Sequence, residues 1–315
     1  MADKEMRAVY CETLMRLAKE DSNIFVLEAD LMRATGTAPF KAAYPDRAIN
    51  VGVAEANMLG VAAGLSAAGK IPFAATFACF ASRRAFDQFF ISCNYAQLNV
   101  KLVGTDPGIT AAFNGGTHMP FEDIGMMRLI PKLWIMEPSD PVSLEKLLEL
   151  SAAHNGCTYM RLPRKSAPVI YDPQERFSLG KGKVLRDGGD LAIIALGAIM
   201  VTEAIKAAQT LKEQGIDAAV IDILSVKPLD RELILSYAAK TNRIVTAENH
   251  QTACGLGSAV AELCSKERPT PIAMVGVQDE FGEVGTQDFL LERFRMSAAE
   301  IVRQSQKLMK SAKPK

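Results

Sequence analysis

Glu55 is a candidate for acid–base chemistry, because it stands in the segment GVAEANM, where a predicted strand meets a helix rich in small residues. A carboxylate flanked by apolar side chains is partly desolvated, and burial raises the pKa of a carboxyl group unless a partner compensates. Spacing alone supports a second interpretation equally well, in which Glu55 faces solvent at a helix N-terminus and is favoured there by the helix dipole.

A cluster of aromatic residues follows Glu55 along the chain. Phe77 and Phe80 lie three apart in TFACF, and five of the 14 phenylalanines fall within residues 77–90. Composition alone favours a hydrophobic core for such a cluster. The alternative is a slot for a planar ring, because offset stacking suits flat heterocycles.

His118 is a further candidate, because it follows two glycines in NGGTHMPFED and precedes a predicted helix start near Phe121. A histidine in a glycine-rich loop can approach a ligand closely, and its side chain titrates near neutrality. The chain has only three histidines. We expect a surface role at a helix end for His154, and the loop residue His250 could serve either structure or function.

The segment RLPRK places three cations close together at Arg161, Arg164 and Lys165. It predicts either a solvated linker or an anion-binding corner for a phosphate or a carboxylate. The sequence contains no G-x-x-x-x-G-K-[ST] loop, H-E-x-x-H helix or G-x-S-x-G elbow. The commonest nucleotide, zinc-protease and serine-hydrolase sites are thereby excluded.

The composition is that of an ordinary globular protein. The 315 residues balance 36 Lys and Arg against 36 Asp and Glu, so the formal net charge is zero. A balanced charge argues against nucleic acid or an anionic membrane as the main partner. The six cysteines form no C-x-x-C pair, which indicates reduced thiols rather than disulfides or a zinc site. No apolar run approaches about 18 residues and the N-terminus is highly charged, so we expect a cytoplasmic protein.

Alternating helices and strands predict an α/β fold with two domains, each a mostly parallel sheet covered by helices. The Pro-, Gly- and charge-rich stretch that begins at RLPRK breaks the alternation and marks a linker. We expect a first domain at residues 1–165, a linker at 166–185 and a second domain at 186–315. The clearest predicted strands are 23–30, 71–78, 100–106, 133–140, 190–197, 218–224, 243–249 and 271–277, and the clearest predicted helices are 4–20, 55–68, 86–98, 143–153, 201–215, 231–241 and 297–310.

The motifs GVAEANM, TFACF, the glycine loop ending in THMP, and RLPR occur in the order and at the spacing of a known family. The chain resembles the second half of transketolase, as it occurs in bacteria and archaea that split the enzyme into two chains. Each motif is weak alone, but the ordered set is specific and covers essentially the whole chain. The resemblance implies a pyrimidine-binding thiamin diphosphate domain to about residue 165, followed by the transketolase C-terminal domain.

The resemblance also implies how the cofactor would be held. The family's catalytic glutamate matches Glu55, which would hydrogen-bond the aminopyrimidine ring of thiamin diphosphate and favour its reactive tautomer. Phe77 and Phe80 match the aromatic residues that pack on that ring. Asp30 matches an acidic residue near the cofactor, and Val53 lines the same pocket.

On the substrate side, the resemblance implies that His118 is catalytic and hydrogen-bonds oxygens of the sugar. Arg7 and Arg161 match substrate-binding arginines of the family. Asn114 stands where a typical transketolase has an acidic residue, four before the loop histidine. Asp106 stands twelve before that histidine, where a second histidine often contacts the phosphate of the donor.

These departures predict an unusual substrate. Ala34 replaces a phosphate-binding serine of the family, and Asp106 would repel a phosphate dianion by like charge. Transfer of a two-carbon ketol unit from a ketose to an aldose is expected from the resemblance. The donor would be a specialised ketose with a different anionic or polar end, rather than an ordinary pentose phosphate.

Full-length transketolase also has an N-terminal domain whose G-D-G…N segment holds Mg2+ and the diphosphate, and nothing like it occurs here. We therefore expect no metal ligands in this chain and an N-terminal transketolase subunit as partner, in a heterotetramer of two pairs. The beta subunit of a 2-oxo acid dehydrogenase thiamin component and a non-catalytic regulatory paralogue remain as alternatives. Deoxyxylulose-phosphate synthase fits less well, because it normally carries both halves in one chain.

Overall fold

The computed structural model describes residues 4–310 and contains two separate sheets. The first sheet has seven strands in the order β10-β5-β6-β4-β3-β1-β2. All its neighbouring pairs are parallel except β10 with β5, which are antiparallel. Its strands are β1 (Ile24–Glu28), β2 (Ala48–Asn50), β3 (Ile71–Phe77), β4 (Lys101–Thr105), β5 (Trp134–Met136), β6 (Thr158–Leu162) and β10 (Ser225–Lys227).

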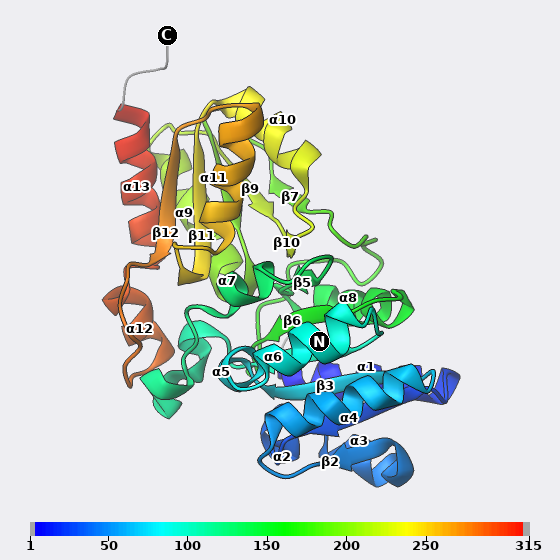
Figure 1. Cartoon of the computed structure of the whole chain (residues 1–315). Coiled ribbons are helices and arrows are strands. Elements are labelled where there is room, and N and C mark those ends of the chain that lie inside the picture. Colours follow the sequence, from blue (N-terminus) through cyan, green and yellow to red (C-terminus); the bar gives the residue numbers. More distant parts are fainter. Residues whose placement is uncertain (1–3, 311–315) are drawn as a thin grey trace.

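The second sheet has five strands in the order β12-β11-β8-β9-β7 and lies above the first in Figure 1. Only β7 runs antiparallel to its neighbour, β9. The strands are β7 (Lys183–Arg186), β8 (Leu191–Ala195), β9 (Ala218–Asp222), β11 (Ile244–Gln251) and β12 (Ile272–Val277).

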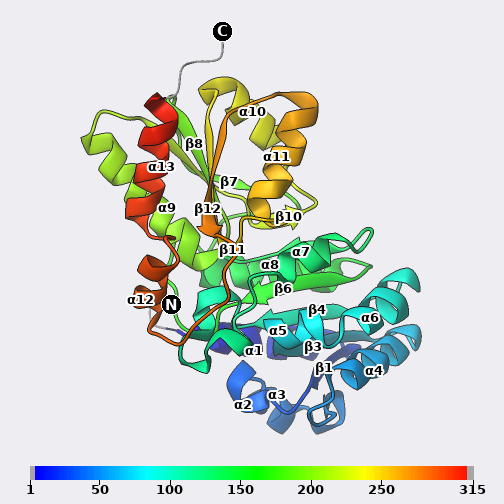
Figure 2. The ribbon, with the colours of Figure 1, turned by 60° about the vertical axis from the view of Figure 1, so that its left-hand side comes forward.

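Helices cover both faces of each sheet, which explains why the central strands are apolar without alternation. In the first domain, Phe73 and Ala75 of β3 pack with helix α1, whereas Ala74 between them packs with α4 on the opposite face. In the second domain, α9 and α13 lie on one side of the sheet and α10 and α11 on the other (Figure 2). These helices are α1 (Met6–Glu20), α4 (Glu55–Ala67), α9 (Gly197–Glu213), α10 (Arg231–Thr241), α11 (Leu256–Glu267) and α13 (Ala298–Lys310).

Shorter helices connect these layers. Helix α8 (Pro141–Ala153) packs beside α1, and its first turn is closed by a capping box between Asp140 and Ser143. The aromatic stretch after β3 folds as α5 (Ala78–Arg83), α6 (Phe86–Gln88) and a π-helical segment at Phe89–Tyr95. The remaining helices are α2 (Met32–Thr35), α3 (Ala38–Ala43), α7 (Asp123–Arg128) and α12 (Gln287–Arg293).

The two-domain α/β architecture predicted from the sequence is confirmed. The short strands β2 and β7 were not predicted, and β7 begins inside the predicted linker at 166–185. Strand β6 occupies residues that begin the predicted linker stretch, so Arg161 lies inside the first sheet. Strand β10 belongs to the second half of the chain, yet it pairs with β5 at the edge of the first sheet. Residues 163–182, all of which the structure describes, form no helix or strand.

Candidate functional site

The candidate site lies where β1, β3 and β4 end. Asp30 follows β1 by two residues, Phe77 is the last residue of β3, and Asp106 follows β4 directly. Carboxyl ends of parallel neighbouring strands meet at one edge of a sheet, which is where ligands bind in open α/β folds. Asp30 and Asp106 both adopt left-handed backbone conformations, with φ of 63° and 55°, which are uncommon for residues other than glycine. Backbone of this kind clusters at functional sites.

Phe77, Phe80 and His118 form a group of rings at this edge. The ring centroids of Phe77 and Phe80 are 5.9 Å apart, and the His118 imidazole stands edge-on to both, at 6.0 Å and 5.3 Å. Arg83 donates from Nη2 to the carbonyl oxygen of Thr117 at 2.8 Å, which ties α5 to the loop that carries the histidine. The two aromatic residues and the loop histidine of the sequence analysis are therefore brought together.

Glu55 is the first residue of α4, and only 5% of it is exposed. Its Oε1 accepts a hydrogen bond from Nη1 of Arg84 at 3.0 Å. The guanidinium carbon of Arg84 also lies 3.9 Å from the centre of the Phe80 ring. Burial of Glu55 is confirmed, and the partner that compensates its charge is Arg84. This contact joins the carboxylate to the ring group through Phe80.

Asp30 and Val53 lie at an exposed rim. The backbone N–H of Asp30 donates to Oδ1 of Asn50 at 2.9 Å, and Nδ2 of Asn50 donates to Oδ1 of Asp30 at 3.2 Å. Val53 is 72% exposed. Asn114, which precedes His118 by four residues, is also exposed. These three predicted site residues stay open to a partner or a ligand.

Four predicted residues meet in what we call the anion corner: Arg7, Ala34, Asp106 and Arg164. Nη1 of Arg7 donates to the carbonyl oxygen of Ala34 at 3.2 Å, and the Arg7 backbone N–H donates to the carbonyl oxygen of Arg164. Nε of Arg164 donates to Oδ1 of Asp106 at 2.7 Å, and its guanidinium carbon lies 5.2 Å from the Phe77 ring centre. Burial raises the pKa of Asp106, and Arg164 partly offsets that shift. The anion corner therefore adjoins the ring group.

Arg161 lies outside this corner, and its burial argues against the substrate-binding role that the resemblance implied for it. Its side chain is fully buried within β6. It contacts Asp123 through Nε at 2.8 Å and Nη2 at 3.1 Å, Glu137 through Nη1 at 2.5 Å, and the carbonyl oxygen of Asn249 through Nη2 at 2.9 Å. Arg164 lies beyond the end of the strand and is the arginine of RLPRK that reaches the site.

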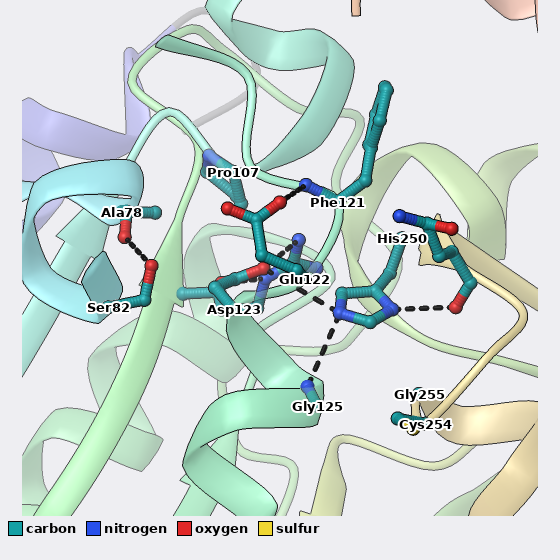
Figure 3. A network of polar contacts seen from close by, with 12 residues as sticks. Ala78, Ser82, Pro107, Phe121, Glu122, Asp123, Gly125, His250, Cys254 and Gly255 are labelled. Carbon is teal, nitrogen blue, oxygen red and sulfur yellow. Dashed lines mark hydrogen bonds and ion pairs between the residues drawn. The ribbon is translucent and has the colours of Figure 1, made fainter. Parts of the chain in front are cut away.

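A second buried network joins the two domains near Arg161. Figure 3 shows His250 of β11 beside Gly125 and Asp123 of α7. Nε2 of His250 accepts from the Gly125 N–H at 3.3 Å, and Nδ1 lies 2.6 Å from the carbonyl oxygen of Gln251. Burial lowers the pKa of His250 to about 4. The imidazole is therefore neutral, and both of its ring nitrogens contact backbone groups. His154 caps the end of α8 and packs on Trp134.

The charge balance around Arg161 predicts a pH effect on stability. Burial raises the pKa of Glu137 to about 7, although Arg161 opposes the shift. One guanidinium faces two carboxyl groups, Asp123 and Glu137, so ionising both leaves a net buried charge. Because the folded pKa of Glu137 lies above the unfolded one, its stabilising contribution is complete below about pH 4.5 and is lost as the pH rises through about 7. We expect the melting temperature to fall between pH 6 and pH 8.5.

Glu137→Gln tests this effect, because a glutamine keeps a hydrogen-bonding carbonyl next to Arg161 and cannot ionise. Thermal unfolding across that pH range should show a shallower decline in the variant. Burial also raises the pKa values of Asp222 and Glu248 to about 7, so part of the slope should remain. An identical slope in both proteins would show that Glu137 does not titrate there.

Among residues 4–310, no group of three or more His, Cys, Asp or Glu side chains could hold a metal ion. No helix in the same range is long and apolar enough to cross a bilayer. The six cysteines are unpaired, and all but Cys254 are buried.

The fold and the site define the class of the chain: an α/β protein whose first sheet presents a buried carboxylate and aromatic rings at its carboxyl edge. Residues 2–169 match the transketolase pyrimidine-binding domain, and residues 180–301 match the transketolase C-terminal domain. The chain therefore belongs to the transketolase family of thiamin diphosphate enzymes. This confirms the resemblance drawn from the motifs.

The relatives include subunits of split transketolases. The 6-deoxy-6-sulfo-D-fructose transketolase subunit SqwH of Clostridium sp. (strain MSTE9) is 51% identical over 298 residues, which cover 95% of this chain and 92% of that protein. An apulose-4-phosphate transketolase subunit of Phocaeicola vulgatus is 36% identical over 87% of this chain and 88% of its own length. A solved structure described as a split gene transketolase, an inactive beta4 tetramer, is 42% identical, covers 98% of both chains and superposes with a TM-score of 0.89. These relatives support a C-terminal subunit of a split transketolase and do not favour the 2-oxo acid dehydrogenase.

Proposed function

We propose that this chain is the C-terminal subunit of a thiamin diphosphate-dependent enzyme that transfers a two-carbon ketol unit from a ketose to an aldose. The observation that carries the proposal is the buried Glu55 carboxylate beside the ring group of Phe77, Phe80 and His118. A carboxylate near a group of aromatic rings suits a flat, nitrogen-containing ring, which needs one polar partner at its edge and apolar contact on its face.

The residues of this chain would divide the work as follows. Glu55 would hydrogen-bond the edge of the aminopyrimidine, and Phe77 and Phe80 would hold its face. Asp30 and Val53 would border the cofactor from the rim. When bound, thiamin diphosphate supplies the nucleophilic carbon that ketol transfer requires. His118 would hydrogen-bond sugar oxygens and hold the ketose in register with that carbon.

The metal and the diphosphate belong to a second chain in this proposal. An N-terminal transketolase subunit would hold Mg2+ and the diphosphate, and two such pairs would form a heterotetramer. The related split gene transketolase whose beta chains form an inactive tetramer by themselves supports this dependence. We also propose the cytoplasm as the location, because a reducing compartment suits the unpaired cysteines.

The donor in this proposal is a ketose with an anionic end. Arg7 and Arg164 line the anion corner beside the ring group, where such an end would lie. Two relatives are named for substrates of this kind, 6-deoxy-6-sulfo-D-fructose and apulose 4-phosphate. Asn114 and the rim of the site would contact the sugar between its two ends.

Ketol transfer by the purified chain, alone and mixed with the product of a neighbouring N-terminal-subunit gene, tests the proposal. Thiamin diphosphate, Mg2+, an aldose acceptor and several ketoses would be supplied in parallel. We expect product only from the mixture. Decarboxylation of a 2-oxo acid by the mixture would instead establish the dehydrogenase, and a stable complex that turns over no donor would establish the regulatory paralogue.

A further inference from the structure

Asp106 holds Arg164 by one edge of its guanidinium. Nε of Arg164 lies 2.7 Å from Oδ1 and 2.5 Å from Oδ2 of Asp106, whose side chain is only 3% exposed. An arginine has five N–H donors, and these contacts occupy the one on Nε. The side chain of Arg164 is 24% exposed and its guanidinium carbon lies 5.2 Å from the centre of the Phe77 ring, so the guanidinium adjoins the ring group while Asp106 partly neutralises its charge.

Arg7 on the other side of the corner is neutralised in the same way. Its Nε donates to Oε2 of Glu5 at 2.7 Å, and its Nη1 donates to backbone carbonyls of α2. Ala34 in that helix has no hydroxyl to offer a ligand. Four N–H donors of Arg164 and two of Arg7 take no part in these contacts, so discrimination between anions must come from the charge of the corner rather than from a shortage of donors.

The formal charge of the corner is small. Arg7, Arg164 and Lys165 all act on Asp106 as cations, while Glu5 and Asp106 are the acids paired with the two arginines. With the neighbouring residues Lys165 and Glu5 included, three positive and two negative charges give the anion corner a formal net charge of +1. A ligand end group with one negative charge balances that charge, whereas a dianion leaves an excess negative charge in a partly buried site.

We propose that Asp106 is a specificity-determining residue of the anion corner. Because of Asp106, the corner selects a ketose whose end group carries a single negative charge, such as a sulfonate or a carboxylate, over one that ends in a phosphate dianion. The proposal rests on the proposed ketol transfer and adds the class of its donor. Coulomb repulsion is proportional to ligand charge, so Asp106 opposes a dianion about twice as strongly as a monoanion. At the same time, its contact with Arg164 fixes the guanidinium that recognises either group.

Three ketohexoses that differ only at C6, with a sulfonate, a carboxylate or a phosphate, test the proposal in the assembled complex with thiamin diphosphate and Mg2+. For the wild type we expect a higher kcat/KM with at least one of the singly charged donors than with the phosphate. The better of the two identifies the natural end group. Asp106→Asn should raise kcat/KM for the phosphate by about tenfold relative to the singly charged donors. The change should appear in KM, because the charged end group of the donor is remote from its reacting carbonyl carbon in the proposed binding mode.

A ketose with no charged end is the internal control, because a loss of activity with that donor would report damage to the site as a whole rather than a change in the recognition of charge. Glu5→Gln supplies a second variant on an exposed side chain, and it should shift the same ratio in the same direction, by less. An unchanged phosphate-to-sulfonate ratio in both variants would overturn the proposal. So would equal losses for all donors, which would indicate a structural role. Failure of the proposed function itself is distinguishable, since the wild-type complex would then transfer ketol from no donor at all.

Discussion

Replacing Glu55 with glutamine is expected to lower the rate of ketol transfer by the assembled complex about 10²- to 10⁴-fold, the range typical of a lost proton-transfer group. A glutamine keeps the size of the side chain and a hydrogen-bonding oxygen, but it cannot carry the negative charge or share a proton with a ring nitrogen. Initial rates at saturating donor, with thiamin diphosphate and Mg2+ in excess, would measure the loss.

Fold and assembly must be intact for that loss to be interpreted. The glutamine is nearly isosteric and still offers Arg84 a neutral hydrogen-bond acceptor. The half-exposed guanidinium of Arg84 can also be solvated by water. The free energy of unfolding and the formation of the complex should therefore match those of the wild type. Glu262→Gln is a matched control, because Glu262 also pairs with an arginine, Arg128, but lies on α11 and is 58% exposed. Its activity should be unchanged. A Glu55→Gln complex that retains more than a tenth of wild-type activity would remove Glu55 from the catalytic machinery.

The sequence predicted most of the fold because its signals were local. Strands β1, β3 and β4 are apolar runs of five to seven residues that are covered on both faces, and each lies within its predicted range. Strand β6 was missed because a charged residue, Arg161, lies inside it and resembles the start of a polar linker. Strand β10 was missed because its pairing with β5 joins residues about 90 positions apart, which no local pattern reports.

In the candidate site, too, the residues in local motifs were predicted, whereas contacts between residues distant in the sequence were not. Phe77, Phe80 and His118 could be recognised from their motifs, and the structure gathers them at one edge. Arg84 was missed, since its contact with Glu55 spans 29 residues and only the fold brings the two together. The choice between Arg161 and Arg164 needed the strand boundary. A side chain in the middle of a sheet is buried, and one two residues past the strand end can reach a ligand.

Arg161→Leu is expected to give the largest loss of stability, about 3–5 kcal/mol, which is the typical cost of removing one partner of a buried ion pair. The variant would leave Asp123 and Glu137 buried without a cation, together with an unpaired carbonyl oxygen of Asn249. A domain of ordinary stability has only about 5–15 kcal/mol in total, so part of the population could unfold at growth temperature. Denaturant unfolding of the purified chain would measure the change.

A double-mutant cycle separates the lost ion pairs from lost packing. Adding Glu137→Gln to Arg161→Leu removes one of the two uncompensated carboxylates, so the double variant should be more stable than Arg161→Leu alone. Arg231→Leu is the control, because Arg231 forms an exposed pair with Glu267 and its loss should matter far less. If Arg161→Leu unfolded at the same denaturant concentration as Arg231→Leu, the buried network would not stabilise the junction of the domains. Arg161 reaches from β6 to β11, so its removal should also weaken the contact between the two domains. Faster limited proteolysis within residues 163–182 would report that weakening.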